Sequence, residues 1–244
     1  MENKTAFLEA LNYRRSVRVY DNDKQIDTQL VKKCIEQATL APNSSNMQLW
    51  EFHHISSKNV LDQLAVACLG QSAASTAQEM VVVVVRKDLW KNRVKSHKTY
   101  LTHLFGKKQA QEYSKREKFA LNYYKKIMPF AYSEFLGIFG YLKYFGSWIT
   151  GLFRPTYRQL RKSDMRVVAH KSAGLAAQTF MLSMAAEGYD TCPMEGIDSL
   201  RVKKILKLPT SSEINMIISC GIRKPEGVYG DRFRIPFNEV YKHW

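Results

Sequence analysis

The chain has 244 residues, of which 45% are hydrophobic, and its formal net charge at pH 7 is +15. This length and composition are enough to bury a core, so they exclude a largely disordered chain and predict one folded domain over residues 1–244. A basic chain favours anionic partners, but basicity alone does not choose between a nucleotide, a nucleic acid and a membrane.

The first residues, Met1–Thr5, are polar, and no apolar signal segment follows them. We therefore expect the protein to stay in the cytoplasm. The cysteines lie far apart among apolar neighbours and lack Cys-x-x-Cys spacing, which indicates reduced core thiols rather than a zinc site. They are Cys34, Cys68, Cys192 and Cys220.

Hydrophobic periodicity predicts helices interleaved with strands along the chain. The expected helices cover residues 3–14, 28–38, 58–69 and 167–187, with Thr28 as an N-cap and Gly188 as a terminator. The expected strands cover residues 51–55, 80–85 and 214–220. The valine run at 81–85 shows no alternation, so this strand should be buried on both faces. Strands mixed with long helices indicate an α/β or α+β sandwich.

The middle of the chain is basic and then aromatic. Residues 86–166 contain 19 Lys and Arg against 5 Asp and Glu, a net charge of +14. Residues 88–126 are predicted to be helical, whereas residues 130–153 are rich in aromatic side chains but interrupted by glycines and charges, which argues against a membrane span. We expect a helical hairpin packed on the main domain or on a partner subunit, with an interfacial membrane element as the alternative.

Two arginine clusters lie near opposite ends of the sequence. Arg14, Arg15 and Arg18 fall within five residues, and alternation puts Arg232 and Arg234 on one side of an extended segment. Guanidinium groups suit phosphate oxygens, so the clusters could close around one phosphate, although both could equally be solvated surface charges.

Two further segments carry polar or flexible residues. The loop at residues 42–50 holds several Asn and Ser side chains that could grip a polar ligand or simply cap their own turn. The segment at residues 193–196 ends in Gly196, which allows a ligand to approach the backbone. An ordinary connection between a helix and a strand would explain it as well.

Four motifs, taken in their order along the chain, resemble those of the FMN-dependent nitroreductase family. The motifs are Arg14-Arg15-Ser16-Val17-Arg18, Pro42 to Trp50, Pro193-Met194-Glu195-Gly196 and Arg232-Phe233-Arg234-Ile235-Pro236. The resemblance covers roughly residues 5–86 and 165–244. Leu49 departs from it because the family usually has proline there, and Ala74 stands where some relatives carry a basic residue.

The resemblance implies a fold and a cofactor site. The fold would be an α+β sandwich with a central, antiparallel-rich sheet flanked by helices and a helical insertion at about 88–165. The chain would form a homodimer with FMN at the interface. The FMN-binding residues implied are Arg14, Arg15, Ser16 and Arg18; Asn43, Ser44 and Asn46, supplied by the partner subunit; Gln71; Pro193, Met194, Glu195 and Gly196; and Arg232 and Arg234.

The implied chemistry is a ping-pong hydride transfer. NADH or NADPH would deliver hydride to flavin N5, and a flat conjugated acceptor, nitroaromatic or quinone-like, would take the electrons. No side chain is implied as a general acid, and no metal is expected. Two alternatives stay open: the same fold with reductive dehalogenase or flavin-fragmenting chemistry, and a basic membrane- or nucleic-acid-binding protein. No nucleic-acid module is recognisable, so nucleic acid is not expected, whereas a membrane contact through residues 130–153 stays open.

Overall fold

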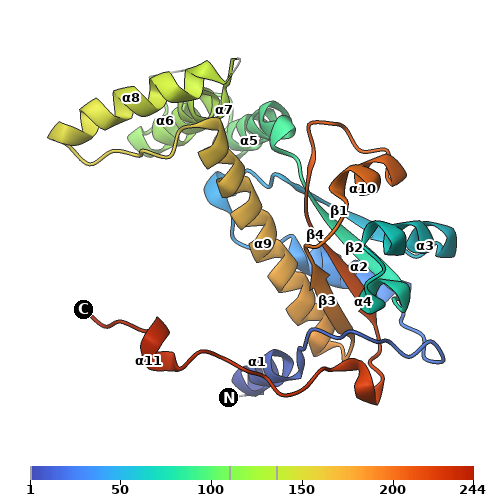
Figure 1. The fold of residues 1–244 in the computed structure, drawn as a ribbon. Helices are drawn as coiled ribbons and strands as arrows, with labels where there is room; N and C mark the ends of the chain where they lie inside the picture. Colours follow the sequence, from blue (N-terminus) through green and yellow to red (C-terminus); the bar gives the residue numbers. More distant parts are fainter. Residues whose placement is uncertain (1, 110, 136) are drawn as a thin grey trace.

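The core of the protein is a four-stranded antiparallel sheet, seen in a computed structural model that describes residues 2–109, 111–135 and 137–244. The strands are β1 (Trp50–Ile55), β2 (Glu79–Val85), β3 (Asp190–Met194) and β4 (Glu213–Gly221). They lie in the order β1-β2-β4-β3, with β3 at an edge (Figure 1). An antiparallel sheet covered by helices confirms the predicted α+β sandwich.

Strand β2 runs through the centre of the molecule, and all seven of its residues are buried. Val81 and Val83 belong to the core beside helices α2 (Thr28–Ala38) and α9 (Lys162–Ala186). Val82 and Val84 belong to the core on the opposite face, beside α3 (Lys58–Ala67), α4 (Ser72–Ser75) and α10 (Ser199–Ile205). Because side chains alternate along a strand, one apolar run serves both layers, which confirms the predicted two-sided burial.

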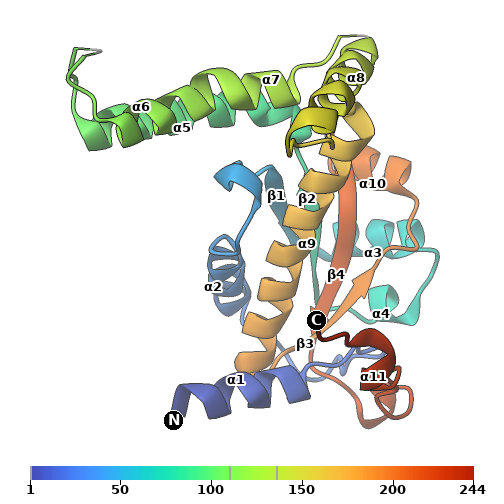
Figure 2. The same cartoon turned by 90° about the vertical axis from the view of Figure 1, so that its left-hand side faces the viewer.

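Helix α9 is 25 residues long and contacts the sheet, α1 (Glu2–Tyr13) and α2 (Figure 2). Its buried face is rich in alanine, at 169, 173, 176 and 177, and small side chains let the helix lie close to the sheet and to α2.

Two predicted helix starts were wrong. Helix α9 begins at Lys162 rather than at residue 167, because Asp164 forms a capping box with Arg161. The N-cap of α2 is Asp27, whose carboxylate accepts from the Gln29 amide, and Thr28 is the first helical residue. The four cysteines are free and buried, as predicted, and burial raises the pKa of Cys34 and of Cys68 to about 11.

The insertion lies between β2 and α9. It contains α5 (Trp90–Phe105), α6 (Lys115–Asn122), a π-helical turn (Tyr123–Ile127), α7 (Met128–Tyr132) and α8 (Ile138–Phe153). Figure 1 shows these helices projecting from one end of α9. Over the part of the chain that the structure describes, no helix combines the length and apolar character needed to cross a membrane.

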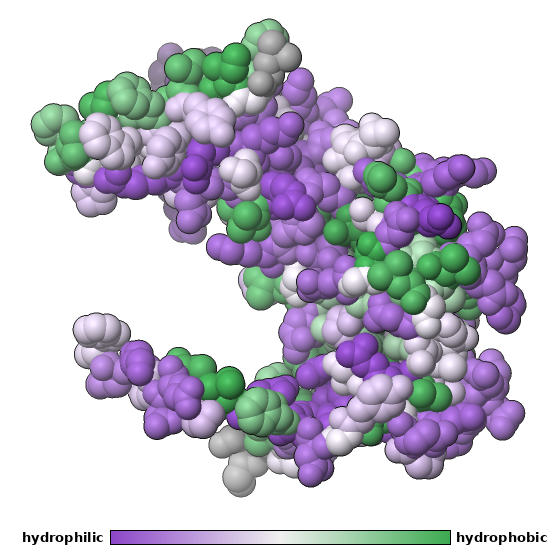
Figure 3. Space-filling view, in the orientation of Figure 1, coloured by the Kyte–Doolittle hydropathy of each residue, from purple (hydrophilic) through white to green (hydrophobic). Residues whose placement is uncertain are grey.

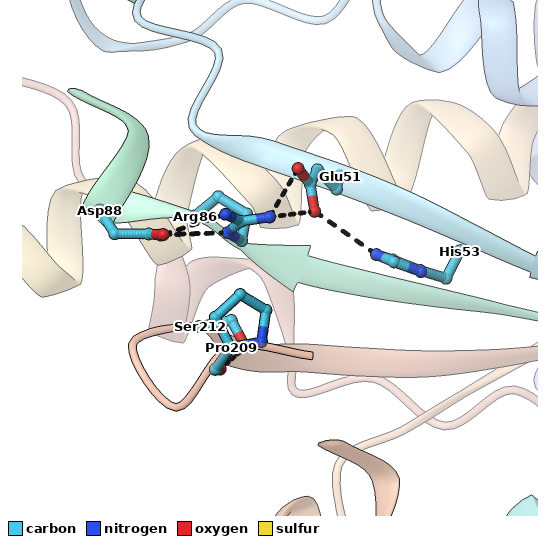
Figure 4. A network of polar contacts seen from close by, with 6 residues as sticks. All are labelled: Glu51, His53, Arg86, Asp88, Pro209 and Ser212. Carbon is cyan, nitrogen blue, oxygen red and sulfur yellow. Dashed lines mark hydrogen bonds and ion pairs between the residues drawn. The ribbon is translucent and has the colours of Figure 1, made fainter. Parts of the chain in front are cut away.

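An ion-pair network clamps the start of the insertion to the sheet (Figure 4). The Arg86 guanidinium donates to both carboxylate oxygens of Glu51 in β1, each at 2.7 Å, and to Asp88. Burial alone would raise the pKa of Asp88, but hydrogen bonds and charge from Arg86 outweigh it and hold that pKa below its ordinary value of 3.8.

The C-terminal segment leaves the main body as an arm. After β4, a 3₁₀ turn (Pro225–Gly227) leads into an extended stretch and a short helix, α11 (Phe237–Val240). Figure 1 shows the arm projecting on the same side as the insertion, from the opposite end of α9.

Candidate functional site

The two arginine clusters meet in one pocket. Residues 14–18 follow α1, residues 228–234 begin the C-terminal arm, and together they enclose a cavity of about 270 Å³. Its lining carries five guanidinium groups and one carboxylate, from Arg14, Arg15, Arg18, Arg232, Arg234 and Asp231. The volume lies below the range of about 300–1,000 Å³ typical of pockets for drug-sized ligands, so the cavity suits an anionic group such as a phosphate better than a whole cofactor.

Arg14 of this pocket has a buried polar atom, Nε, without a hydrogen-bond partner among the described residues. Burial, followed by the charges of Arg232 and Arg234, lowers the pKa of Arg14. A partly buried cation among like charges is stabilised by an anion, so the electrostatics of the pocket favour an anionic ligand.

Arg232 and Arg15 also hold the pocket together. The Arg232 guanidinium donates to the carbonyl oxygens of Asn12 at 3.0 Å and of Arg14 at 2.6 Å, at the C-terminal end of α1. Arg15 donates to the Gly230 carbonyl at 2.8 Å. Arg234 is exposed, and its guanidinium donates to the carbonyl of the adjacent Phe233. Arg232 therefore fastens the C-terminal arm to α1 while contributing its charge to the pocket.

The pocket lies against the edge strand β3. Ser16 bridges to Thr191, and the Val17 amide donates to the Thr191 carbonyl at 3.1 Å. The Thr191 hydroxyl is buried and lacks a hydrogen-bond partner among the described residues. Burial raises the pKa of Cys192, and the nearby charges of Arg18 and Arg14 oppose that rise. The arginines thus lie beside the strand that leads into the segment at residues 193–196.

The turn at residues 193–196 and the side chain of Gln71 also come together. Pro193 and Met194 end β3, and the exposed Glu195 and Gly196 follow them. The Gln71 side chain, just before α4, donates to the Gly196 carbonyl at 2.9 Å. Residues far apart in sequence therefore share one edge of the sheet, which runs from the arginine pocket to this turn.

Sequence reasoning missed the residues that position this edge. The carboxylate of Asp190, at the start of β3, is fully buried and accepts from the backbone and the side chain of Arg223, with the Nε contact at 2.8 Å. The Arg223 guanidinium lies 4.3 Å from the Tyr13 ring and also donates to the Tyr13 carbonyl at 2.9 Å. This network fixes the end of α1 immediately before Arg14. The available signal was an acidic residue at the start of β3 and a basic residue just after the end of its neighbour, β4.

The polar loop lies away from the arginine pocket within one chain. The backbone amide of Ser44 donates to the Ser172 hydroxyl of α9 at 3.3 Å. Helix α1, which leads into the arginine pocket, lies toward the C-terminal end of α9 (Figure 2). Asn43 accepts from the Gln48 amide at 2.9 Å and donates to Asn46 at 3.3 Å, so these side chains hold their own turn. A single chain does not bring Asn43, Ser44 and Asn46 to the other predicted site residues.

The backbone of this loop is strained. Ser45, Asn46 and Gln48 have φ values of 53°, 49° and 47°. These values lie in the left-handed region, which residues other than glycine rarely adopt. Such strain persists where the surrounding structure holds it, and it gathers at functional sites.

A second cavity, of about 420 Å³, opens beside the same loop. Its walls are mainly apolar and aromatic, and Ser44 and Ser45 contribute its polar part. The Ser45 hydroxyl lies 2.7 Å from that of Tyr123, which ties the loop to the insertion. The other lining residues are Ile127, Met128, Phe130, Ala131, Tyr132, Thr156, Tyr157, Leu160 and Met165. No part of α8 is among them.

The fold and the pocket define a mixed helix-and-sheet protein with an arginine-lined pocket at the edge of an antiparallel sheet. Comparison with known proteins identifies the class: the model of the Nitroreductase family matches residues 11–222. The chain belongs to the nitroreductase family and is an oxidoreductase.

Relatives and solved structures agree with this assignment. Protein DrgA of Synechocystis is 26% identical over 215 residues, covering 88% of this chain and 83% of its own. MhqN of Bacillus subtilis, which carries a provisional NAD(P)H nitroreductase name, is 23% identical and covers 97% of this chain and 98% of its own.

Two solved structures share the fold. A provisionally assigned nitroreductase, YdfN of Bacillus subtilis, has a TM-score of 0.74 at 24% identity and covers 99% of this chain and 100% of its own. Another, from Exiguobacterium sibiricum in complex with FMN, has a TM-score of 0.66 at 23% identity and covers 98% of this chain and 97% of its own.

Proposed function

We propose that this protein is an FMN-dependent oxidoreductase that takes hydride from NADH or NADPH and reduces a flat conjugated acceptor. The observation that carries the proposal is the arginine pocket at the edge of β3, with the unpartnered Nε atom of Arg14 buried in it. A structural neighbour in complex with FMN supports the choice of cofactor. When bound, FMN supplies the two-electron chemistry between the nicotinamide and the acceptor.

The residues of the chain divide the work of binding. Arg14, Arg232 and Arg234 hold the phosphate, since guanidinium groups form strong charge-assisted bonds to its oxygens. Ser16 binds the ribityl chain. Arg18 provides positive charge near the pyrimidine edge of the flavin, where reduction builds negative charge.

The remaining contacts of the same subunit come from the other end of this edge. Gln71 and the turn of Pro193, Met194, Glu195 and Gly196 face the ring. Gly196 is exposed, and a Cβ atom added there would have the Gln71 amide nitrogen, at 3.8 Å, as its neighbour, so the backbone is open to close approach by a ligand.

A second copy of the chain completes the site. The C-terminal arm exposes large apolar side chains, including Phe233 at 77% and Phe237 at 71%, which favours a covering partner. Figure 3 shows a hollow side of the molecule between the insertion and this arm. A homodimer formed on that side gives Asn43, Ser44 and Asn46 of one subunit access to the flavin of the other.

The aromatic cavity beside the loop is our candidate for part of the acceptor site. Tyr123, Tyr132 and Tyr157 line it, and aromatic walls favour planar ligands through offset stacking. The walls come from the loop at Ser44 and Ser45 and from residues within 123–132 and 156–165. Small changes of acceptor shape should therefore alter turnover more than they alter flavin binding.

The test is direct. The purified protein should be yellow, and NADH or NADPH should bleach the flavin band anaerobically. Turnover of nitroaromatic, quinone and halophenol acceptors then separates the proposed reaction from reductive dehalogenation. A protein that is colourless, fails to bind added FMN and runs as a single subunit would contradict the proposal.

A further inference from the structure

Helix α8 is built with its apolar side outward. Its large side chains at helical spacing are exposed, with Tyr141 at 66%, Phe145 at 61% and Leu152 at 62%. The complete outward stripe is Ile138, Tyr141, Leu142, Phe145, Trp148, Ile149 and Leu152. In Figure 3 the hydrophobic surface gathers along the outer edge of this projection. A helix packed on a protein core shows the opposite arrangement.

The inner face of α8 explains why the stripe points outward. The ammonium group of Lys143 is buried and donates to the carbonyl oxygens of Phe130, Ala131 and Ser133, at 2.8–3.1 Å, at the end of α7. These bonds satisfy carbonyls that a helix end leaves without intrahelical partners. Turning α8 to bury its apolar side would expose these carbonyls and break the bonds.

Glycine contacts reinforce this orientation. A Cβ atom on Gly140 would lie 2.5 Å from a Glu134 oxygen and 3.1 Å from the Arg161 Cα. One on Gly151 would lie 2.1 Å from the Arg158 guanidinium, which donates to the Gly151 carbonyl at 3.1 Å. The polar and small face of α8 is therefore fitted to Glu134, Arg158 and Arg161, and the apolar face is left without such a fit.

The insertion that contains the stripe is cationic. Arg154 and Arg158 are exposed just after the C-terminal end of α8, and Lys125 and Lys126 are exposed elsewhere in the insertion, in the π-helical turn. The Arg161 guanidinium lies 4.9 Å from the Tyr144 ring of α8. An apolar stripe with Trp and Tyr, within a segment rich in exposed Lys and Arg, is typical of helices that lie in the interface of an anionic membrane.

We propose that α8 docks this enzyme on the surface of an anionic lipid bilayer. The helix lies in the plane of the interface, with Phe145, Trp148 and Leu152 among the upper acyl chains and the neighbouring cations on the headgroups. At 16 residues it is about 24 Å long, which suits a helix lying in the interface. The stripe faces away from the hollow side proposed for the dimer, so both contacts can exist together (Figure 3).

Vesicle sedimentation of the full chain tests the proposal. The protein should bind vesicles containing phosphatidylglycerol and bind pure phosphatidylcholine about tenfold or more weakly. The double variant Phe145→Glu, Leu152→Glu should weaken binding about hundredfold. A matched control, Val66→Glu, Leu200→Glu, places the same charges at exposed apolar positions of the main body and should bind as wild type.

Trp148 gives a second readout that does not depend on a destabilising change. Anionic vesicles should shift its fluorescence to the blue, and the shift should be absent in Trp148→Phe. The proposal is overturned if wild type ignores anionic vesicles, or if the stripe variant binds them as well as wild type. It is also overturned if the stripe variant only changes the oligomeric state, which would make α8 a contact between copies.

Discussion

Replacing Arg14 by methionine should separate ligand binding from folding in a measurable way. The substitution removes a cation whose buried Nε atom has no partner in the part of the chain that the structure describes. Burial and the neighbouring arginines lower the pKa of this cation. If Arg14 makes two charge-assisted bonds to a phosphate, each contributing about 1.5–3 kcal/mol, the Kd for FMN should rise about 10²- to 10⁴-fold.

The same change should not destabilise the protein without ligand. A lowered arginine pKa means that the folded state disfavours the charged form at neutral pH, so removing that charge relieves repulsion. The free energy of unfolding of apo Arg14→Met should equal or exceed that of the apo wild type. Loss of binding without loss of stability is typical of a functional residue.

Fluorescence titration and urea unfolding measure the two effects. Riboflavin, which lacks the phosphate, should bind wild type and Arg14→Met equally. Arg116→Met removes an exposed arginine of α6 and serves as the matched control, with FMN affinity unchanged. Equal weakening for FMN and riboflavin, or a loss of apo stability as large as the loss of binding, would refute the assignment of Arg14 to the phosphate.

Three further predictions concern the framework of the fold. Arg86→Met should lower the free energy of unfolding by about 1–3 kcal/mol near neutral pH. Because Arg86 holds the pKa of Asp88 below 3.8, this stabilisation is complete above pH 3.8 and is lost as the pH falls through the lowered pKa. The difference in unfolding free energy between wild type and Arg86→Met should therefore vanish on acid titration, and a constant difference would contradict the prediction. Lys143→Met leaves the carbonyls at the end of α7 without donors and should lower the free energy of unfolding by about 1–3 kcal/mol; an unchanged urea midpoint would remove Lys143 from that role. Gly227→Ala should destabilise by about 2 kcal/mol or more and reduce FMN binding, since its Cβ would lie 2.3 Å from a backbone carbonyl oxygen, whereas Gly174→Ala, with open space, should be neutral or stabilising in thermal unfolding.

Local sequence signals were reliable for the central elements. The valine run predicted a strand buried on both faces, and β2 serves two core layers. The helix starts were less well predicted, because the capping side chains of Asp27 and Asp164 compete with equally plausible neighbours. The spacing of Arg232 and Arg234 predicted that they share one side, and both line the arginine pocket.

The sequence by itself determined the hydrophobic pattern, the sandwich class and the two arginine clusters, because these depend on residue type and short-range periodicity. Only the tertiary structure decided that the clusters meet, that Asp190 and Arg223 hold α1 in place, and that α8 turns its apolar face outward. Periodicity shows that a helix has two unlike faces, but the choice of the inward face depends on contacts from elsewhere in the chain. For α8, the hydrogen bonds of Lys143 and the close packing around Gly140 determine which face points inward.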